Sequence, residues 1–547
     1  MARRKTLVLS IDSGCWEYLS PVMDRGQMPH VARLIERGVH GVLESTMPPI
    51  TPVAFSTLIT GTNPGKHGIF DWTVRSADGK MQPASAALRR VAPFWHYLNQ
   101  AGVRVGLFNI PMTYPVQPIE GFLVPGITVP EGARNLTYPP DALSVIEDRY
   151  GPYAVDVPRS LLDDGVGSYH RAWIEYEQMQ TDAALTLMDE YRVDVLAFNY
   201  ASLDRINHFS PQKADLEDVL INIDRQIGRF LARYPEANVI LMSDHGSRRI
   251  KGAFLLGKWL AQNGYAIYGE RSLNIPKHEV NFALGRYFQA KGINGTRERL
   301  IRNAVRYLFA PVPQAWLRPV WKAIHRAAPD ALDYRFRERL DWSRTRVYAT
   351  SNSGPLIFNR NGGAGTGHSA QEYEAMRETL IRELSRVADP AGEGPLFSQV
   401  YRREELYHGP ALTEAPDLIG DHYGSTCDLI VDNVPGSFCF VNRLNRFGDH
   451  KRDGLFVLSG PDFVQADGES HRARIMDLPA TLLNLYDVPI PESFDGRVLI
   501  DFLTAASLTQ HPVRTQAADG IESLGATGYG AAEEEDVVAR LRDLGYL

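Results

Sequence analysis

The sequence predicts an α/β fold with a mostly parallel central sheet, and three observations support this prediction. Apolar runs of strand length recur along the chain, segments with helical periodicity separate several of them, and polar residues stand where the runs end. Alternating strands and helices are typical of parallel sheets that are flanked by helices. Polar residues at strand ends are typical of open α/β sheets, which bind ligands at the carboxyl ends of their strands.

The expected strands are short apolar runs followed by polar or turn-forming residues. They cover, in chain order, Thr6 to Ile11, Val103 to Ile110, Asp194 to Asn199, Asn238 to Met242, Pro355 to Phe358 and Leu455 to Leu458. The spacing of apolar residues predicts helices over Val31 to Arg37, Asp182 to Tyr191 and Leu216 to Tyr234. We therefore expect a sheet whose strands are joined by helical crossovers.

Two segments depart from this alternation. Residues 261–342 combine amphipathic helical patterns with many Arg and aromatic residues, which predicts a helical cap inserted between a first core segment, 1–260, and a second, 343–505. Such a cap is either a plain helical subdomain with solvated Arg side chains or a lid that reaches toward an anionic or amphiphilic substrate. Residues 506–547 become rich in Ala, Thr and Gly and then acidic, which predicts a tethered C-terminal tail with a docking end.

The overall composition is that of a globular protein. The chain has 547 residues, 44% hydrophobic and 22% charged, and its mean hydropathy is -0.24, which excludes a disordered chain and a multi-span membrane protein. The formal net charge of -7 provides no general attraction for nucleic acid. The N-terminal residues lack a signal-peptide pattern, and the three scattered cysteines do not suggest a disulfide framework, so we expect a cytoplasmic enzyme.

Four distant stretches carry carboxylates and imidazoles in positions that suit a metal site. The six residues are Asp12, Asp204, His208, Asp244, His245 and His450. Side chains of these types hold zinc or a similar divalent ion, so the pattern indicates a two-metal hydrolase. Asp204 and His208 share one face if their segment is helical, because side chains four residues apart lie above one another on a helix. The adjacent Asp244 and His245 can both reach inward only from a loop.

Thr51 is the candidate nucleophile. It follows a proline-marked loop and begins an apolar helical stretch. A hydroxyl group at a helix N-terminus near divalent ions can ionise, because the metal and the helix dipole both favour the alkoxide. The alternative is a structural role, since Ser and Thr residues at the start of helices usually cap them.

Several segments together resemble a known family. They are MPHVARLIERGVHGVLESTMPPITPVAFSTLITGTNPGKHGIFDW, SLDRINHF, SDHG, GDHKRDGLFVLSGPDF and DLPATLLNLYDVPIPESFDGRVL. Their order and spacing are similar to those of the type I phosphodiesterase and nucleotide pyrophosphatase branch of the alkaline phosphatase superfamily. The resemblance implies an alkaline-phosphatase-like core, and it covers most of the chain outside the cap and the tail.

The resemblance also implies a role for each candidate residue. It assigns one divalent ion to Asp12, Thr51, Asp244 and His245, and a second ion to Asp204, His208 and His450. Zinc is the expected metal, with manganese or iron as alternatives, because the ligands are oxygen and nitrogen atoms only. The Thr51 hydroxyl would displace an alcohol from a phosphate ester and form a covalent phospho-threonine intermediate, which water would then hydrolyse.

One position departs from the family pattern. In the pattern of the family that this chain resembles, HGI is followed by two residues and an Asn that donates to phosphate. This chain has Phe70, Asp71 and Trp72 after HGI. Neither an ionised carboxylate nor an indole reproduces that amide, so the phosphate contacts must come from elsewhere. This departure puts nucleotide specificity in question more than it does the phosphoryl chemistry.

Asn109 is the leading substitute for the missing amide. It stands at the end of a predicted strand, as Asp12 and Asp244 do, and is therefore expected near them. Lys66 and Arg205 are weaker candidates. The alternative for Asn109 is a turn residue before a proline, a position in which Asn is frequent.

The predicted function is hydrolysis of a small-molecule phosphate ester, most directly a phosphodiester. Phosphomonoesterase, phosphonate monoester hydrolase and phosphotransferase activities are the alternatives within the superfamily, because a phospho-enzyme can pass its group to water or to another alcohol. Sulfatase activity is disfavoured, because Thr51 cannot form the aldehyde that sulfatases need. The non-enzyme alternatives are a metal-dependent ligand-binding protein and a membrane-surface protein that contacts lipid through the Arg-rich cap. No specific nucleic acid binding is expected.

Overall fold

The computed structural model describes residues 3–75, 81–133, 135–268, 340–359, 369–392, 394–431, 439–441, 446–465, 468–518 and 528–543. The predicted cap over 261–342 lies almost entirely outside these residues, so its helices stay a prediction. Within the described ranges, no helix combines the length and the apolar character that are needed to cross a membrane.

An eight-stranded sheet forms the centre of the molecule, with the strand order β19-β2-β18-β8-β1-β7-β5-β6. In that order the strands are β19 (Ser470–Arg474), β2 (Gly38–Glu44), β18 (Asp453–Ser459), β8 (Asn238–Met242), β1 (Thr6–Ile11), β7 (Val195–Tyr200), β5 (Val105–Ile110) and β6 (Gly121–Pro125). Only β18 runs against its neighbours in this sheet; the other strands point the same way. The expectation of a mostly parallel α/β sheet is therefore confirmed.

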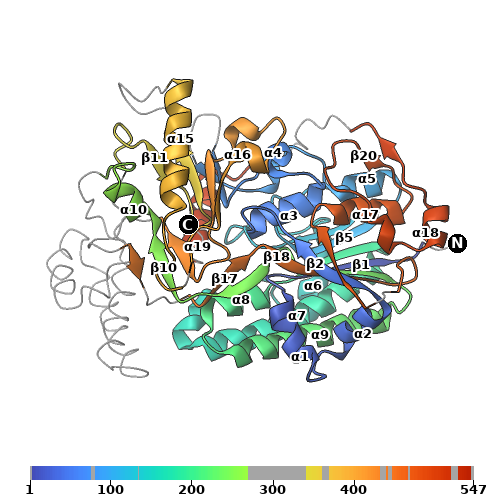
Figure 1. Cartoon of the computed structure of the whole chain (residues 1–547). Helices are drawn as coiled ribbons and strands as arrows, with labels where there is room; N and C mark the ends of the chain where they lie inside the picture. The colour runs from blue at the N-terminus through green and yellow to red at the C-terminus, as the bar shows by residue number, and fades with distance from the viewer. Residues whose placement is uncertain are drawn as a thin grey trace.

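Helices cover both faces of this sheet (Figure 1). Leu7, Leu9 and Ile11 of β1 belong to one hydrophobic cluster and Val8 to another, because successive side chains of a strand point to opposite faces. The first face packs against α1 (Trp16–Met23), α2 (Pro29–Arg37), α6 (Asp141–Tyr150), α7 (Val166–Glu190), α8 (Ser202–Phe209) and α9 (Lys213–Arg233). The second face packs against α3 (Thr51–Thr60), α5 (Phe94–Gln100) and α17 (Asp477–Leu485). Burial on both faces explains why the strands appear as continuous apolar runs in the sequence.

Helix α7 extends well beyond the predicted Asp182 to Tyr191. Its earlier turns bury polar side chains, including Glu177, Gln180 and Thr181, and these interrupt the apolar periodicity from which a helix is predicted. The two other predicted helices correspond to α2 and α9, each with a boundary shift of a few residues.

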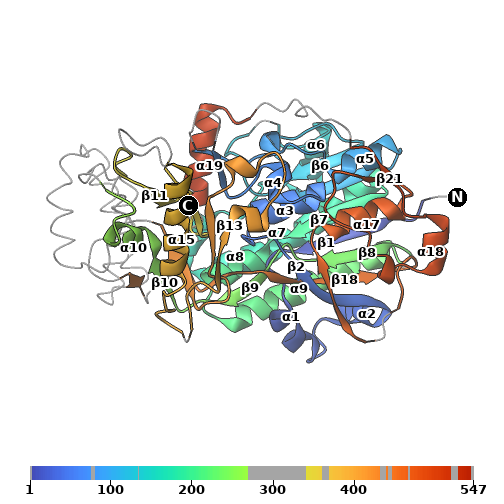
Figure 2. The same cartoon turned by 45° about the horizontal axis from the view of Figure 1, so that its top comes forward.

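A second lobe lies beside the central sheet, at the left of Figures 1 and 2. It contains an antiparallel sheet of β11 (Val347–Ala349), β12 (Pro355–Phe358), β14 (Leu418–Asp421) and β13 (Gln399–Arg402). A smaller sheet of β15 (Cys427–Ile430), β10 (Gly252–Leu255) and β16 (Phe440–Val441), together with α10 (Leu256–Gln262) and α15 (Ala370–Leu384), shares its hydrophobic cluster. The predicted strand Pro355 to Phe358 thus exists but belongs to this lobe, because an apolar run does not specify its sheet.

Candidate active site

The seven residues predicted as ligands or nucleophile meet where the parallel strands end. Asp12 follows β1, helix α8 with its two ligands follows β7, and Asp244 and His245 follow β8. Because β7, β1 and β8 are neighbours in the sheet, these segments adjoin at one edge. Strand β17 (Gly448–Lys451) adds His450 by pairing with β9 (Gly246–Arg249), which begins directly after His245. Each of the seven residues is at most 2% exposed.

His245 is the centre of the first predicted group. Its Nε2 lies 3.1 Å from Asp244 Oδ2 and 3.7 Å from Asp12 Oδ1. Thr51 Oγ1 lies 3.4 Å from the same nitrogen. Asp244 and His245 lie in a loop after β8, so both side chains can turn inward although the two residues are adjacent. The structure therefore brings together the four residues that the resemblance assigns to one ion.

Asp204 is the centre of the second predicted group. Its Oδ1 lies 3.1 Å from His208 Nε2 and 3.4 Å from His450 Nε2. Both Asp204 and His208 are on α8, so the prediction that they share a helix face is confirmed. His208 Nδ1 lies 2.8 Å from the Gly448 carbonyl oxygen and 3.1 Å from Arg446 Nε, and its Nε2 is directed at Asp204. A backbone carbonyl in this position orients an imidazole for metal binding.

The ligand atoms fit a pair of neighbouring cations. Those of Asp12, Asp244 and His245 lie within 4.8 Å of one another, and so do those of Asp204, His245 and His450. His245 belongs to both sets, so the two sets adjoin. Asp12 Oδ1 and Asp244 Oδ2 are buried and accept no hydrogen bond from any described residue. Buried oxygen atoms without partners are costly in a protein interior, and a divalent cation would satisfy them.

The electrostatics of the cluster point the same way. Burial and the carboxyl groups of Asp244 and Asp204 raise the pKa of Asp12 well above its usual range. Burial and Asp204 raise the pKa of Asp244 to about 8. Burial, followed by the neighbouring His245, lowers the pKa of His450 to about 3. Asp204 differs, because His208 and His450 outweigh its burial and hold its pKa well below the usual range. A bound cation would restore ionised carboxylates at Asp12 and Asp244 beside neutral imidazoles.

Ser13 ties the two groups together, and it was not predicted from the sequence. Its backbone N–H donates to Asp244 Oδ1 at 3.3 Å, and its hydroxyl donates to Asp204 Oδ1 at 2.7 Å. The hydroxyl oxygen also lies 3.4 Å from His245 Nδ1. A φ of 68° turns the chain at Ser13 directly after the β1 ligand, which places this short side chain between the groups. The sequence does contain a signal for this role, because Ser13 is a small polar residue directly after the predicted ligand Asp12 at a strand end.

Thr51 does not cap its helix. Ile50 occupies the N-cap position of α3, and Thr51 is the first helical residue. The Thr51 hydroxyl faces His245 as described above, so the capping alternative is wrong. The position still lies at the positive end of the helix dipole, which favours an anion there.

Asn109 lies behind the ligands rather than among them. It is 4% exposed, has a φ of 57° at an irregularity of β5, and donates from Nδ2 to the Asn199 carbonyl oxygen at 2.8 Å. Asn199 in turn approaches Asp12 Oδ2 at 3.5 Å. The left-handed backbone agrees with the alternative of a turn-forming role, and donation from Asn109 to a phosphate stays a prediction.

The two weaker candidate donors are engaged by other groups. Lys66 donates to Asp495 Oδ1 at 2.6 Å and to the Ser493 carbonyl oxygen at 2.8 Å. Arg205 is buried and donates from Nη1 to Asp204 Oδ2 at 2.8 Å. Arg205 therefore contacts a predicted ligand, and it is placed to orient that carboxylate.

A small polar pocket opens beside the ligand cluster. It is lined by Ile50, Trp72, Asn352, Ser353, Tyr423, Asp428, Arg446, Asp449 and His450. Ile50 precedes the candidate nucleophile, and Trp72 stands where the family pattern has its amide. Arg446, which was not predicted from the sequence, places Nη2 3.3 Å from His208 Nε2. The second lobe thus contributes much of the wall that faces the ligands.

A third group of metal-type ligands is formed by His422, Asp428 and Asp449, and its two carboxylates belong to the wall of this pocket. Two guanidinium groups already contact its carboxylates. Arg248 lies 2.7 Å from Asp449 Oδ2, and Arg446 lies 3.3 Å from Asp449 Oδ1 and 3.6 Å from Asp428 Oδ2. Because these cations occupy the side on which a metal would bind, we interpret the group as a buried ion-pair network.

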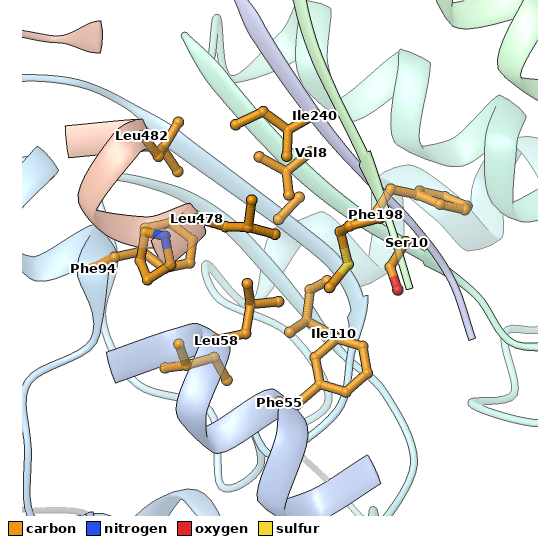
Figure 3. A pocket seen from close by; sticks show the side chains of 14 residues that line it. Val8, Ser10, Phe55, Leu58, Phe94, Ile110, Phe198, Ile240, Leu478 and Leu482 are labelled. Carbon is orange, nitrogen blue, oxygen red and sulfur yellow. The ribbon is translucent and has the colours of Figure 1, made fainter. Parts of the chain in front are cut away.

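An apolar cavity lies between α3 and the central sheet (Figure 3). Its walls include Val8, Phe55, Leu58, Ile110 and Leu482, and none of its lining residues belongs to the predicted ligand set. Apart from Ser10, the residues that line this cavity are apolar, and none of them carries a charge that could hold a phosphate. It is a packing gap beneath the nucleophile's helix, whereas the polar pocket borders the ligands.

Comparison with known proteins agrees with the geometry. No curated protein sequence matches this chain. Solved structures of human and murine ectonucleotide pyrophosphatase/phosphodiesterase 5 are each 14% identical to it, with TM-scores of 0.46 and 0.45, and the alignments cover 92% of this chain and 100% of theirs. The family model for type I phosphodiesterase / nucleotide pyrophosphatase matches residues 6–436, well over half of the chain. The chain therefore belongs to the type I phosphodiesterase / nucleotide pyrophosphatase family and is a hydrolase of that family.

Proposed function

We propose that this protein is a two-metal phosphodiesterase that acts through a phospho-threonine intermediate. One ion is bound by Asp12, Thr51, Asp244 and His245, and the other by Asp204, His208 and His450. The observation that carries the proposal is the pair of adjoining ligand sets that share His245, with Thr51 Oγ1 3.4 Å from the shared imidazole. His450 lies beyond the stretch that the family model matches, so its assignment rests on the geometry, which is its 3.4 Å contact with Asp204 and its place in one ligand set with Asp204 and His245.

The chain's own groups account for much of the reaction. When bound, two divalent ions would favour ionisation of the Thr51 hydroxyl and neutralise charge on the phosphate. The Thr51 oxygen attacks phosphorus, an O–P bond forms, and the bond from phosphorus to the leaving alcohol breaks. Water then attacks the phospho-threonine, which releases the phosphate product and restores the hydroxyl. The N-terminus of α3 adds the positive end of its dipole beside the attacking oxygen.

The polar pocket is the proposed place for an alcohol group of the substrate. It adjoins both Ile50 and His450, so a substituent on phosphorus would lie against its wall while the phosphate contacts the ligands. The match to the type I phosphodiesterase family favours a diester over a monoester. Zinc is the proposed metal because the donor set is three carboxylates, three imidazoles and a hydroxyl, and manganese and iron suit the same donors.

The test compares three variants on a substrate panel. The panel holds bis-p-nitrophenyl phosphate, its monoester, a phosphonate monoester, nucleotide diesters and lipid head-group esters, each with metal-depleted and zinc- or manganese-restored protein. Thr51→Ala should lose nearly all hydrolysis and retain bound metal, whereas Thr51→Ser should keep part of the activity. Ser56→Ala is the matched control, because it removes another buried hydroxyl from the same helix. The proposal would be refuted if every ester of the panel stayed uncleaved with both metals supplied, or if Thr51→Ala kept full activity.

A further inference from the structure

The last helix of the chain docks beside the nucleophile. Helix α19 (Ala531–Asp543) lies far from α18 (Ala505–Gln510), which is also coloured red, in both overall views (Figures 1 and 2). Val537 and Leu541 are each 1% exposed and share a hydrophobic cluster with Ile50, Val53, Trp72 and Ile127. Ile50 and Trp72 are also walls of the polar pocket. The predicted C-terminal tail therefore ends in a helix that supports the start of α3.

Polar contacts hold α19 in this place. Asp536 Oδ2 accepts from the Glu131 backbone N–H at 2.7 Å, and the Tyr529 hydroxyl donates to the Thr128 carbonyl oxygen at 2.7 Å. Arg540 donates from Nη1 to the Val129 carbonyl oxygen at 3.2 Å. These contacts come from α19 itself and from Tyr529, which precedes it, so together they fix the position of Arg540.

A chain of charged groups leads from Arg540 to the ligand cluster. Arg540 Nη2 lies 2.8 Å from Asp156 Oδ2, and Arg205 Nη2 lies 3.8 Å from the same oxygen. Arg205 also donates from Nη1 to Asp204 Oδ2 at 2.8 Å. The Arg205 and Asp204 side chains are 4% and 0% exposed, so solvent screens their contact little. Arg205 is thus shared between a structural carboxylate and a predicted metal ligand.

Arg540 competes with Arg205 for the Asp156 carboxylate. Among the described residues, Arg205 and Arg540 are the cations that contact Asp156. If Arg540 is removed, the Asp156 carboxylate attracts Arg205 without competition and draws it away from Asp204. Asp204 Oδ2 then loses its donor, and the Ser13 hydroxyl on Oδ1 is left to hold the carboxylate toward the imidazoles. Loss of a group that orients a metal ligand weakens metal binding or activity by about 10- to 100-fold in known sites.

We propose that Arg540 is a positioning residue for Asp204, acting through Asp156 and Arg205, so that the C-terminal helix is a functional part of the active site. The inference rests on the proposed function, because it assigns Asp204 to the second metal ion. The relay acts directly on the second ion, because Arg205 donates to Asp204, and it reaches the first group, around His245 and Asp12, at longer range.

The test measures zinc binding by the full-length protein. Arg540→Met should release one of the two ions at a free zinc concentration about tenfold higher than the wild type does, the low end of the range for ligand-orienting groups. At limiting zinc its kcat should fall, with KM little changed, and excess zinc should restore kcat. Arg540→Lys should recover part of the affinity. Arg233→Met is the matched control, since Arg233 ends α9 and pairs with Asp189 at the surface.

Each outcome supports or refutes the relay. Asp156→Asn keeps the side-chain shape and should weaken the same ion, which provides a second variant if Arg540→Met does not fold. Two ions held with wild-type affinity in both variants, or an equal loss in Arg233→Met, would overturn the relay and leave the proposed function standing. A wild-type protein that binds no zinc, manganese or iron would overturn both.

Discussion

Removing the metal ions should make the protein less stable as the pH rises from about 6.5 to about 8. In the metal-free site, burial and Asp204 raise the pKa of Asp244 from 3.8 to about 8. The folded state then holds a proton on this carboxyl group throughout the window, whereas the unfolded chain has lost it. Asp244 alone should therefore lower the free energy of unfolding by about 1.4 kcal/mol per pH unit, or about 2 kcal/mol over the window. Asp12, whose pKa is also raised, acts in the same direction.

Buried histidines do not mask the fall in the free energy of unfolding between about pH 6.5 and about pH 8. Burial lowers the pKa of several histidines to about 3, so their contribution to stability rises with pH only up to about 6.5; they are His67, His422 and His450. Burial also raises the pKa of Glu177 and Asp428 to about 7. Their contribution to the free energy of unfolding therefore falls as the pH rises, in the same direction as that of Asp244. Both lie outside the predicted ligand set, so the difference between metal-free and zinc-loaded protein removes their contribution.

Urea unfolding at four pH values in this window provides the measurement. The metal-free curve should fall relative to the zinc-loaded curve, in which the ligand carboxylates stay ionised. Metal-free Asp244→Asn should lose the part of the slope that Asp244 contributes, because an amide of the same shape has no proton to release. Parallel curves for metal-free and zinc-loaded wild type would show that Asp244 is not a buried acid beside Asp204, and the geometry of the ligand cluster would be refuted with it.

Three smaller predictions follow from the same packing. Ser13→Ala should weaken zinc binding about tenfold in a chelator competition, because both groups lose the hydroxyl that joins them, and unchanged affinity would exclude this role. Val8→Ile should raise the melting temperature through up to about 0.8 kcal/mol of added burial in the apolar cavity, and a lower melting temperature would mean that the cavity cannot accept a methylene group. Gly496→Ala should cost at least about 1–3 kcal/mol, because its Cβ would lie 1.7 Å from the Met476 carbonyl oxygen; denaturant unfolding measures this loss, and wild-type stability would contradict it.

The central sheet could be predicted because its strands are buried on both faces. The predicted and observed limits of β1 and β8 agree, since each run ends on an apolar residue that a polar residue follows. The sheet to which a strand belongs could not be predicted in the same way. β12 is as apolar as a central strand, but it pairs with β11 and β14 in the second lobe. The pairing depends on contacts between distant segments, which the local pattern does not contain.

The ligand set could be predicted for a related reason. Asp12, Asp204 and Asp244 stand just after neighbouring parallel strands, so the order of the sheet alone brings them together. The groups that hold these ligands gave no comparable signal. Arg205 becomes a partner of Asp204 through one short contact, and Arg540 reaches it only because the chain returns across the molecule. Distances of this kind are set by packing between elements.

The ligand cluster and the polar pocket are built by different parts of the chain, and this separation has a functional consequence. The ligands follow strands of the central sheet, whereas Asn352, Ser353 and Tyr423 of the pocket come from the second lobe. The second lobe can therefore change without moving Asp12 or Asp244. Trp72 stands in the pocket wall where the family pattern has an amide, and α19 packs against it. Substrate choice should thus follow from the lobe and the C-terminal helix, while the phosphoryl chemistry follows from the sheet.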